Sequence, residues 1–301
     1  MRTPISILIP TRNEIRNLRA CLDAIHGWAD EIVVVDSGST DGTIELAESF
    51  DARVVQFRYA GGWPKKRNWA LEHHAWRNEW ILLLDADEIL TEECKSEIAR
   101  AIRSEAYDGY WIPFRIVFLG RLLRFGGTTL WKLCLFRAGK GRYEKRLEDQ
   151  DPRMADMEVH EHVVVEGRVG KLRHPVRHEN VNSLDRYIEK HNEYSNWEAA
   201  VYSNPDCGGL RPTLFGSQAQ RRRWIRRWIM RLPGLPIAVF LYRYVLRGGF
   251  LDGRAGLIHA GFLAIQFFHV KAKIYERQLV QDGCLLARCK SGRHGGVTRA
   301  V

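Results

Sequence analysis

Residues 81–90 read ILLLDADEIL, and this stretch decides the expected fold class. Four successive apolar residues are typical of a strand that is buried on both faces of a parallel sheet. Asp85 and Asp87 follow at the carboxyl end of that strand, which is where open α/β sheets bind ligands. Their carboxylates are hard oxygen ligands, which suit Mg²⁺ or Mn²⁺ carrying a diphosphate. The stretch therefore predicts a cation site at a sheet edge, and the alternative is a strand that ends in solvated acids.

The segments before this stretch alternate between strand and helix patterns. Strands are expected at residues 5–9, 32–35, 53–57 and 80–84, and helices at 14–25, 43–50 and 64–74. Asn13 is expected to cap the first helix, and Pro64 to occupy the first turn of the third. Strands and helices that alternate with short connections predict a parallel sheet with helices on both faces.

The pattern changes after an expected helix over residues 91–103. Strand-like runs follow, separated by loops, at residues 110–118, 133–136 and 159–165. They predict that the second half of the sheet is mixed and that its loops bind a second substrate, the acceptor. A further helix is expected from residue 183 to 202, where Asn204 and Pro205 would end it.

Polar residues follow each of the first two expected strands. The first strand leads into PTRNE instead of a GxGxxG motif, which disfavours a nicotinamide-dependent enzyme. The second ends at Asp36, and Gly38 behind it lets the backbone approach a ligand. An acid at a strand end can accept hydrogen bonds from a base or a ribose. We therefore expect Asp36 to bind a ligand and Asp41 to cap the next helix.

A cationic cluster, KKRN at residues 65–68, begins the third expected helix. Backbone N–H groups and cationic side chains at a helix start together suit a phosphate. The alternative is a solvated face. The phosphate interpretation is favoured because the cluster directly precedes the strand that ends in Asp85.

Four motifs in register, ISILIPTRNE, IVVVDSGSTDGT, KKRNWAL and ILLLDADE, resemble the family 2 glycosyltransferases over residues 4–105. The resemblance implies the GT-A nucleotide-sugar-binding fold, with a mixed, mainly parallel sheet, and an inverting transfer from a nucleotide-sugar donor, expected to be a UDP-sugar. It also implies that the donor nucleotide is bound by Pro10, Thr11, Arg12, Glu14, Asp36, Lys66, Arg67 and Asp85. Asp85 and Asp87 match the DxD motif of the family, in which the second acid is the usual metal ligand.

An inverting transfer also needs a base to take the proton of the acceptor hydroxyl. The candidates lie in RLEDQD at residues 146–151 and in MEVHEH at residues 157–162. The VHE element resembles the acceptor-side motif of the lipopolysaccharide-core and exopolysaccharide branch, which implies Glu161 as the base, with Asp151 second. The alternative for Glu161 is a surface strand of mixed charge. A histidine could complete the metal shell, and the sequence leaves open His160, His162 and His178.

The basic character of the chain belongs to its C-terminal third. The net charge is −4 over residues 1–210, +9 over 211–251, where nine arginines meet no acid, and +5 over 252–301. Such a segment indicates an anionic partner, either nucleic acid or lipid head groups. Nucleic acid is disfavoured, because tryptophan, isoleucine, leucine and proline share the segment and no nucleic-acid-binding motif is present.

Residues 220–230, QRRRWIRRWIM, place aromatic and cationic side chains on opposite faces of an expected helix. This composition is typical of a helix that lies in anionic head groups. We expect membrane contact through Arg223, Trp224, Arg227 and Trp228. The apolar stretches 232–242 and 255–270 are interrupted and too short to predict a single span of the bilayer, so partial embedding is favoured. A helical lid over the catalytic domain is the alternative.

These observations predict three regions: a GT-A catalytic domain at 1–210, a basic amphipathic helical region that associates with a membrane at 211–289, and a disordered tail at 290–301. Six cysteines without a CxxC pair, and no signal peptide, favour a reducing compartment. The resemblance then implies transfer to a lipid-linked glycan acceptor, in lipopolysaccharide or exopolysaccharide biosynthesis, at the cytoplasmic face of the inner membrane. The alternatives are transfer to polyprenyl phosphate and a non-catalytic membrane scaffold.

Overall fold

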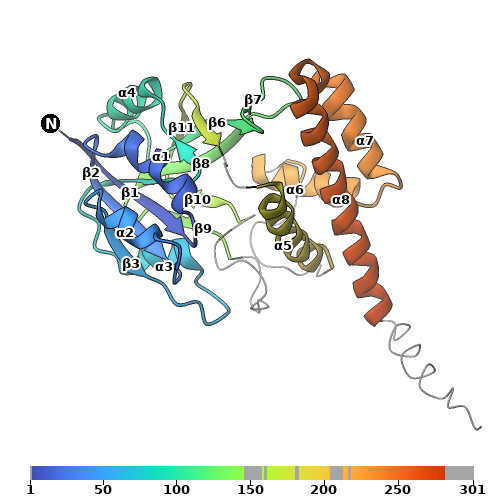
Figure 1. Ribbon diagram of the computed structural model, residues 1–301, viewed down its shortest axis with the longest axis horizontal. Helices are drawn as coiled ribbons and strands as arrows, with labels where there is room; N and C mark the ends of the chain where they lie inside the picture. Colours follow the sequence, from blue (N-terminus) through green and yellow to red (C-terminus); the bar gives the residue numbers. More distant parts are fainter. Residues whose placement is uncertain are drawn as a thin grey trace, which may run out of the picture.

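A large mixed sheet with its covering helices lies beside a group of C-terminal helices (Figure 1). This computed structural model describes residues 2–145, 158, 161–179, 183–203, 213–215 and 218–281. Several predictions fall outside this part of the chain. They concern Asp151, His160, the side chains of Arg223 and Arg227, and the tail at 290–301.

The predicted parallel half of the sheet is confirmed. Its strands are β1 (Thr3–Thr11), β2 (Ala29–Asp36), β3 (Arg53–Gln56) and β4 (Trp80–Leu83), in the spatial order β3-β2-β1-β4. The connections carry α1 (Ile15–Ile25), α2 (Thr43–Glu48) and α3 (Lys66–His73). The isoleucine, leucine and valine residues of β1, β2 and β4 are buried, as expected where both faces of a sheet are covered, whereas the edge strand β3 is partly exposed.

The second half is mixed, as predicted. It contains β5 (Glu88–Ile89), α4 (Glu92–Ala101), β6 (Gly109–Phe118), β7 (Arg121–Leu122), β8 (Leu130–Arg137), β11 (Val169–Lys171) and β12 (Val176–Glu179). The order continues β4-β8-β6-β12-β5, with β8 antiparallel to both of its neighbours and β12 parallel to β6. Because β5 pairs with β12, the turn after β4 is held against a strand that lies about ninety residues further along the chain.

Local expectations fail at three places where a tertiary contact prevails. Asn13 was expected to cap α1, but it has a φ of 56° and its Oδ1 accepts from the Thr40 N–H at 2.9 Å, which ties together the loops after β1 and β2. The third helix begins at Lys66, after Pro64. Within the described residues 161–165 of the strand expected at 159–165, Val163–Val165 form β10, which pairs with β9 (Gly141–Tyr143) apart from the main sheet.

The C-terminal helices are α5 (Leu184–Ser203), α6 (Gln218–Ile229), α7 (Leu235–Leu241) and α8 (Gly253–Gln281), with a π-helical turn at Tyr242–Leu246 and a 3₁₀ turn at Gly249–Asp252. The apolar stretch 255–270, with its polar residues His259 and Gln266, lies within the longer continuous helix α8. By length and composition, Gly249–Gln281 could cross a membrane. Core helices of soluble proteins can have the same length and composition, so these two properties alone do not identify a membrane span.

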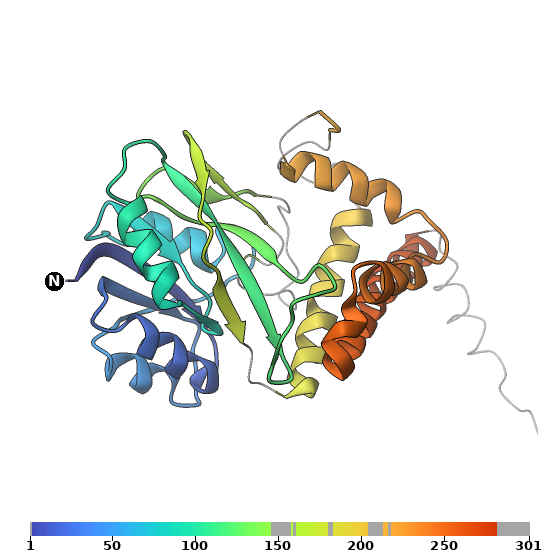
Figure 2. The same ribbon diagram turned by 90° about the horizontal axis from the view of Figure 1, so that it is seen from above.

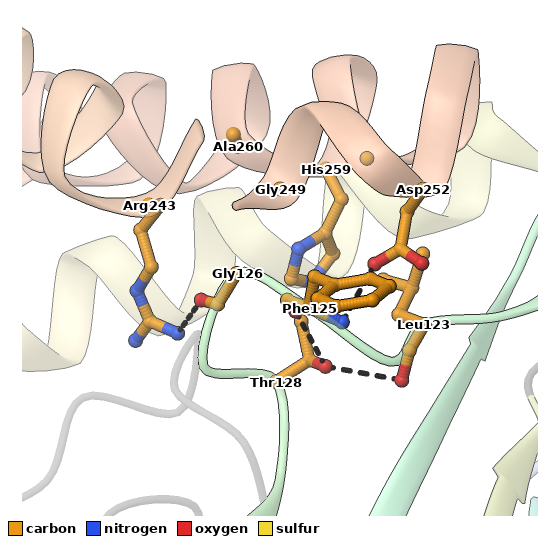
Figure 3. Close-up of a pocket in the computed structure, with 10 residues that line it drawn as sticks. Leu123, Phe125, Gly126, Thr128, Arg243, Gly249, Asp252, His259 and Ala260 are labelled. Carbon is orange, nitrogen blue, oxygen red and sulfur yellow. Dashed lines mark hydrogen bonds between the residues drawn. The ribbon is translucent and has the colours of Figure 1, made fainter. Parts of the chain in front are cut away.

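Two contacts join the helices to the sheet. Tyr187 of α5 and Phe262 of α8 pack against Phe118 at the end of β6. The carboxylate of Asp252 accepts the backbone N–H groups of Arg124 and Phe125, at 2.9 to 3.2 Å, in the loop between β7 and β8 (Figure 3). The predicted boundary at residue 210 stays a prediction, although α5 already packs along α8.

Candidate active site

The ends of β1 and β2 form one wall of the site. Thr11 and Asp36 lie opposite each other in the parallel register. The Asp36 carboxylate accepts from Thr11 Oγ1 at 2.9 Å, from the Ser39 N–H at 2.8 Å, from Ser39 Oγ and from Gln56 Nε2 at 3.4 Å. Burial alone would raise the pKa of Asp36, but these hydrogen bonds outweigh it and hold the pKa below its usual value. Asp36 therefore orders the loop after β2 with both of its oxygens.

The loop after β1 carries the other residues expected at the nucleotide. Pro10 is buried, Arg12 is exposed and Glu14 is partly buried. Asn17 Nδ2 donates to Glu14 Oε2 at 2.6 Å, and the other carboxylate oxygen lies 3.7 Å from Lys190 Nζ. Burial raises the pKa of Glu14. Asp41 was expected to cap α2, but the N-cap position is Gly42, and the Asp41 carboxylate accepts from the Thr43 N–H and from the Ile15 N–H of α1.

The two lysines before Arg67 are buried and bind groups of the protein itself. Lys66 Nζ donates to the Thr11 carbonyl oxygen at 2.8 Å and is almost completely buried. Lys65 Nζ lies 3.1 Å from Glu161 Oε1, and both side chains are fully enclosed. The Glu161 carboxylate, the first candidate for the base, is therefore closed to an acceptor hydroxyl in this structure.

Glu158 occupies the N-terminus of α3, where a phosphate was expected. Its carboxylate accepts the N–H groups of Arg67 and Asn68 at 3.1 and 3.0 Å. The guanidinium of Arg67 donates to the Glu158 carbonyl oxygen and forms an ion pair with Asp85. A helix N-terminus favours any anion, and here a carboxylate from the same chain fills that role.

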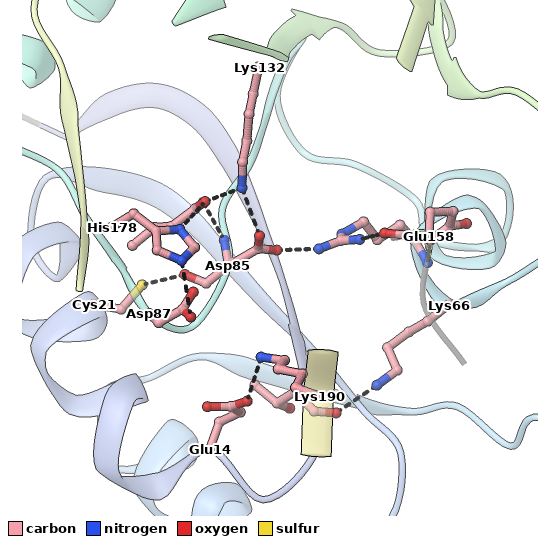
Figure 4. A network of polar contacts seen from close by, with 12 residues as sticks. Glu14, Cys21, Lys66, Asp85, Asp87, Lys132, Glu158, His178 and Lys190 are labelled. Atoms are coloured by element: carbon pink, nitrogen blue, oxygen red, sulfur yellow. Dashed lines mark hydrogen bonds and ion pairs between the residues drawn. The ribbon is translucent and has the colours of Figure 1, made fainter. Parts of the chain in front are cut away.

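Asp85 lies within an internal network of charges (Figure 4). Besides Arg67 it contacts Lys132 Nζ at 3.0 Å, and Lys132 also pairs with Glu88. Glu88 Oε2 in turn accepts the Asp85 N–H at 2.8 Å. Burial would raise the pKa of Asp85, but Arg67 and Lys132 outweigh it and keep the pKa well below its usual value. The first acid of the DxD motif is thus already neutralised by two cations.

Asp87 and His178 face each other at the same sheet edge. His178 Nε2 lies 3.6 Å from Asp87 Oδ2, and its Nδ1 lies 3.4 Å from Glu88 Oε1. Burial would lower the pKa of His178, but Asp87 and Glu88 outweigh it and raise the pKa. A carboxylate on the far ring nitrogen is the usual arrangement that orients a metal-binding histidine. Of the three histidines left open, His178 lies here, whereas His162 lies 3.3 Å from Glu144.

The chemistry of Asp87 and His178 fits two ligands of a cation. In the described part of the chain, no three His, Cys, Asp or Glu side chains converge to form a complete metal cage. Asp87 and His178 offer one oxygen and one nitrogen ligand, a pair that Mn²⁺ accepts. Cations of this kind commonly take their remaining ligands from substrate phosphates and water.

Three residues of the network were missed by sequence reasoning: Glu88, Lys132 and Lys190. Glu88 had a local signal, because it directly follows the DxD motif. Lys132 on β8 and Lys190 on α5 had none. Burial would lower the pKa of Lys190, but Tyr194, Asp87 and Glu14 outweigh it and raise the pKa. Lys190 pairs with Glu14, as Figure 4 shows, and a quarter of the Lys190 side chain is exposed.

The residues expected at the membrane lie on α6. Trp224 and Trp228 pack against each other with ring centroids 6.0 Å apart, and Trp228 is half exposed. Arg226 of the same helix points inward and pairs with Glu198 at 2.9 Å. Part of α6 therefore packs on α5 while Trp228 faces outward.

The sequence matches the family model described as glycosyl transferase family 2 over residues 6–161. It is also similar to the lipopolysaccharide core biosynthesis glycosyltransferase LpsC of Rhizobium meliloti (strain 1021). The two sequences are 30% identical over 290 residues, which cover 93% of this chain and 95% of LpsC.

Two solved structures show a more distant similarity. TarS of S. aureus (residues 1–349) aligns over 94% of this chain and 92% of its own, with a TM-score of 0.44 and 16% identity. Glucosyl-3-phosphoglycerate synthase from Mycobacterium tuberculosis, in complex with Mn²⁺, UDP-glucose and phosphoglyceric acid, aligns over 38% of this chain and 44% of its own, with a TM-score of 0.30 and 22% identity. Neither similarity identifies a residue of the site.

Proposed function

This chain belongs to glycosyl transferase family 2, and from that premise we propose that it transfers a sugar from a UDP-sugar to a lipid-linked glycan. The proposed pathway is lipopolysaccharide or exopolysaccharide biosynthesis, at the cytoplasmic face of the inner membrane. The similarity to LpsC over nearly the whole of both chains supports it. The observation that carries the proposal is the Asp87–His178 pair at the carboxyl end of β4, beside the loops that follow β1 and β2.

The metal ligands we propose are Asp87 and His178, with Mg²⁺ or Mn²⁺ as the cation. When bound, the cation would neutralise the charge that develops on the departing diphosphate. Glu88 holds the imidazole so that Nε2 points toward Asp87. Asp85, paired with Arg67 and Lys132, holds the turn between β4 and β5 in place. We therefore assign Asp85 to the support of the site and Asp87 to the cation.

Lys190 is the cation that we propose for the donor diphosphate. Sequence reasoning expected Lys66 or Arg67 there, but Lys66 donates to Thr11 and Arg67 is paired with Asp85. Lys190 lies next to Glu14, within electrostatic range of Asp87, and keeps part of its side chain exposed. An ammonium beside a cation site suits a diphosphate, because the two positive charges share its negative charge.

For the base, Glu161 remains our first candidate and Asp151 the second. The ion pair between Glu161 and Lys65 has to open before the carboxylate can reach a hydroxyl. The ring of Trp197 on α5 lies 5.8 Å from Lys65 Nζ. We therefore propose that acceptor binding opens this pair by moving α5.

The test of the donor site is calorimetric binding of UDP in the presence of Mn²⁺, together with UDP-sugar turnover. Asp87→Asn should weaken binding and turnover by about 100-fold, since it removes the charged metal ligand. Asp23→Asn, on the exposed face of α1, is the matched control and should behave as the parent protein. Unchanged binding and turnover in Asp87→Asn would contradict the site.

The acceptor is tested separately by mass spectrometry. Lipid-linked glycans and polyprenyl phosphate are incubated with the protein and a panel of nucleotide sugars. A mass increase of one sugar on the glycan supports the proposal, and an increase only on polyprenyl phosphate would replace it with that alternative. No transfer to any acceptor, with Mn²⁺-dependent UDP binding absent as well, would favour a non-catalytic scaffold.

A further inference from the structure

Large apolar side chains gather on the surface where the C-terminal helices meet the sheet. The end of α7 and the two turns after it expose Leu241, Tyr242, Val245, Leu246, Phe250 and Leu251, each by about half or more. Leu119 and Phe125, from the connections on either side of β7, are exposed by 52% and 40%. We call these eight residues the apolar corner.

The two parts of the apolar corner are fastened to each other. The Arg121 guanidinium donates to the Leu251 carbonyl oxygen at 3.4 Å, and the Gly126 N–H donates to the Arg247 carbonyl oxygen at 2.9 Å. The guanidinium of Arg243 donates to the carbonyl oxygen of Gly126 (Figure 3) and also to that of Gly127. Figure 1 shows the connection around β7 next to the paired ends of α7 and α8. The corner is therefore one surface, built jointly by the catalytic sheet and the helices.

The two segments that form the apolar corner are basic. Arg121, Arg124, Arg247 and Arg254 are all exposed there. Residues 109–143 include no acid, and residues 211–275 include only Asp252. The carboxylate of Asp252 is enclosed by the N–H groups of Arg124 and Phe125. These two stretches thus present an apolar centre with a cationic rim.

We propose that the apolar corner inserts into an anionic lipid bilayer and seats the enzyme on the membrane. Leucine and phenylalanine gain from burial among acyl chains, and arginines at the rim can bind lipid phosphates. A second copy of the chain is a poor occupant, because self-association would bring two arginine rims together. This inference rests on the proposed function in one respect, namely that a lipid-linked acceptor lies in the same membrane.

The apolar corner is distinct from α6, which the sequence indicated as the membrane contact. The corner adjoins the end of the α5–α8 pair where Tyr187 meets Phe262. The C-terminal end of α6 instead packs beside Val270, further along α8. In Figure 2, α6 (light orange) lies at one end of α5 (yellow), and the connection around β7 (green) approaches the other.

The position of the corner also fits the reaction. The loop that contributes Phe125 continues directly into β8, where Lys132 pairs with Asp85. At about 3.3 Å per residue, the seven residues from Phe125 to Lys132 span at most about 23 Å. A glycan anchored in the membrane below the corner could therefore extend to the site.

The experiment is flotation of the full chain with vesicles of phosphatidylcholine, with and without phosphatidylglycerol. The Leu246→Glu/Phe250→Glu variant should lose about 100-fold in binding to the anionic vesicles, since two apolar side chains become charged. Val280→Glu is the control, an apolar residue exposed by 47%, close to the 50% of Phe250, and about 40 Å along α8 from Asp252; it should float as the parent does. Trp224→Glu/Trp228→Glu tests α6 and should retain most of the binding.

Three results would overturn the proposal: flotation of the corner variant at the level of the parent, loss confined to the α6 variant, or a dimer that light scattering shows to dissociate in the corner variant. UDP-sugar hydrolysis without vesicles is measured for every variant. Because no residue of the apolar corner touches the site, hydrolysis should be unchanged. If hydrolysis is absent in the parent protein as well, the proposed function fails while the membrane inference still stands on flotation.

Discussion

At the scale of single residues, the exposure of a lysine side chain decides differently from its sequence motif which lysine can bind a ligand. Lys66 lies in a motif that resembles the family pattern, yet its ammonium group is enclosed and bound to a backbone carbonyl. Lys190 lies outside those motifs, yet it faces Glu14 and keeps a quarter of its side chain in solvent. Accessibility decides which of the two can bind a diphosphate, because an enclosed ammonium would have to give up its present partner first.

Lys190→Gln should raise the KM for the UDP-sugar by roughly 10- to 100-fold, which is the usual contribution of a hydrogen bond to a charged group. Lys190→Arg keeps the charge and should recover much of the loss. Steady-state kinetics with the donor varied, together with thermal unfolding, separates this effect from a loss of structure. A donor KM that stays at the parent value in Lys190→Gln would exclude the role proposed for Lys190.

At the scale of elements, α3 depends on a distant residue for its N-terminal cap. Its N-cap position, Lys65, supplies no capping bond, and the N–H groups of Arg67 and Asn68 donate to Glu158 instead. Burial raises the pKa of Glu158, so the negative charge there is costly and the hydrogen bonds are the favourable part. The contact ties the acceptor-side segment to the helix that also positions Arg67 against Asp85.

Glu158→Ala should lower the free energy of unfolding by about 2–4 kcal/mol, because two buried N–H groups lose their acceptor. The two N–H groups donate to different oxygens of Glu158, so Glu158→Gln keeps one acceptor and replaces the other with an NH2 group that cannot accept. Glu158→Gln should therefore cost about half as much as Glu158→Ala, about 1–2 kcal/mol. Urea denaturation followed by circular dichroism measures both. The two variants serve as controls for each other, and equal stability of Glu158→Ala and the parent would refute the capping role.

At the scale of the whole molecule, one buried acid joins the helices to the sheet. Asp252 is nearly fully buried, and its carboxylate accepts the N–H groups of Arg124 and Phe125 in the loop that leads into β8. The helices that we propose to seat the enzyme on a membrane are thereby held against a strand that carries Lys132. The contact of Asp252 with this loop, which we call the joint, therefore links the C-terminal helices to the strand that leads to the site.

Asp252→Ala should destabilise the protein by about 2–4 kcal/mol, since it leaves buried N–H groups without their acceptor. Scanning calorimetry measures the loss, and limited proteolysis should show faster cleavage in residues 123–128. Asp185→Ala, at an exposed position on α5, is the control and should change little. Calorimetry and proteolysis that match the parent would mean that the packing of Phe118 against Tyr187 and Phe262 suffices to hold the joint.

The strand-and-helix alternation up to Asp85 could be predicted because each element is specified by residues close together in the chain. An apolar run such as ILLL between turn signals is typical of a strand buried on both faces of a sheet, and the acids that follow it then lie at the sheet edge. The same local signals failed for Asn13, whose side chain accepts a hydrogen bond from the backbone N–H of Thr40 in the loop after β2. A propensity describes what a residue prefers alone, and a tertiary hydrogen bond can outweigh it.

The sequence by itself determined the fold class, the family and the place of the DxD motif at a strand end. Only the tertiary structure decided which of the open histidines faces Asp87, which cations neutralise Asp85, and which surface gathers apolar side chains beside arginines. These are pairings between residues far apart in the chain, such as Lys132 with Asp85 or Leu251 with Arg121. The pattern of apolar residues along the chain indicates which segments are buried. The partner of a buried charge, in contrast, depends on which segments the strand order of the sheet brings together.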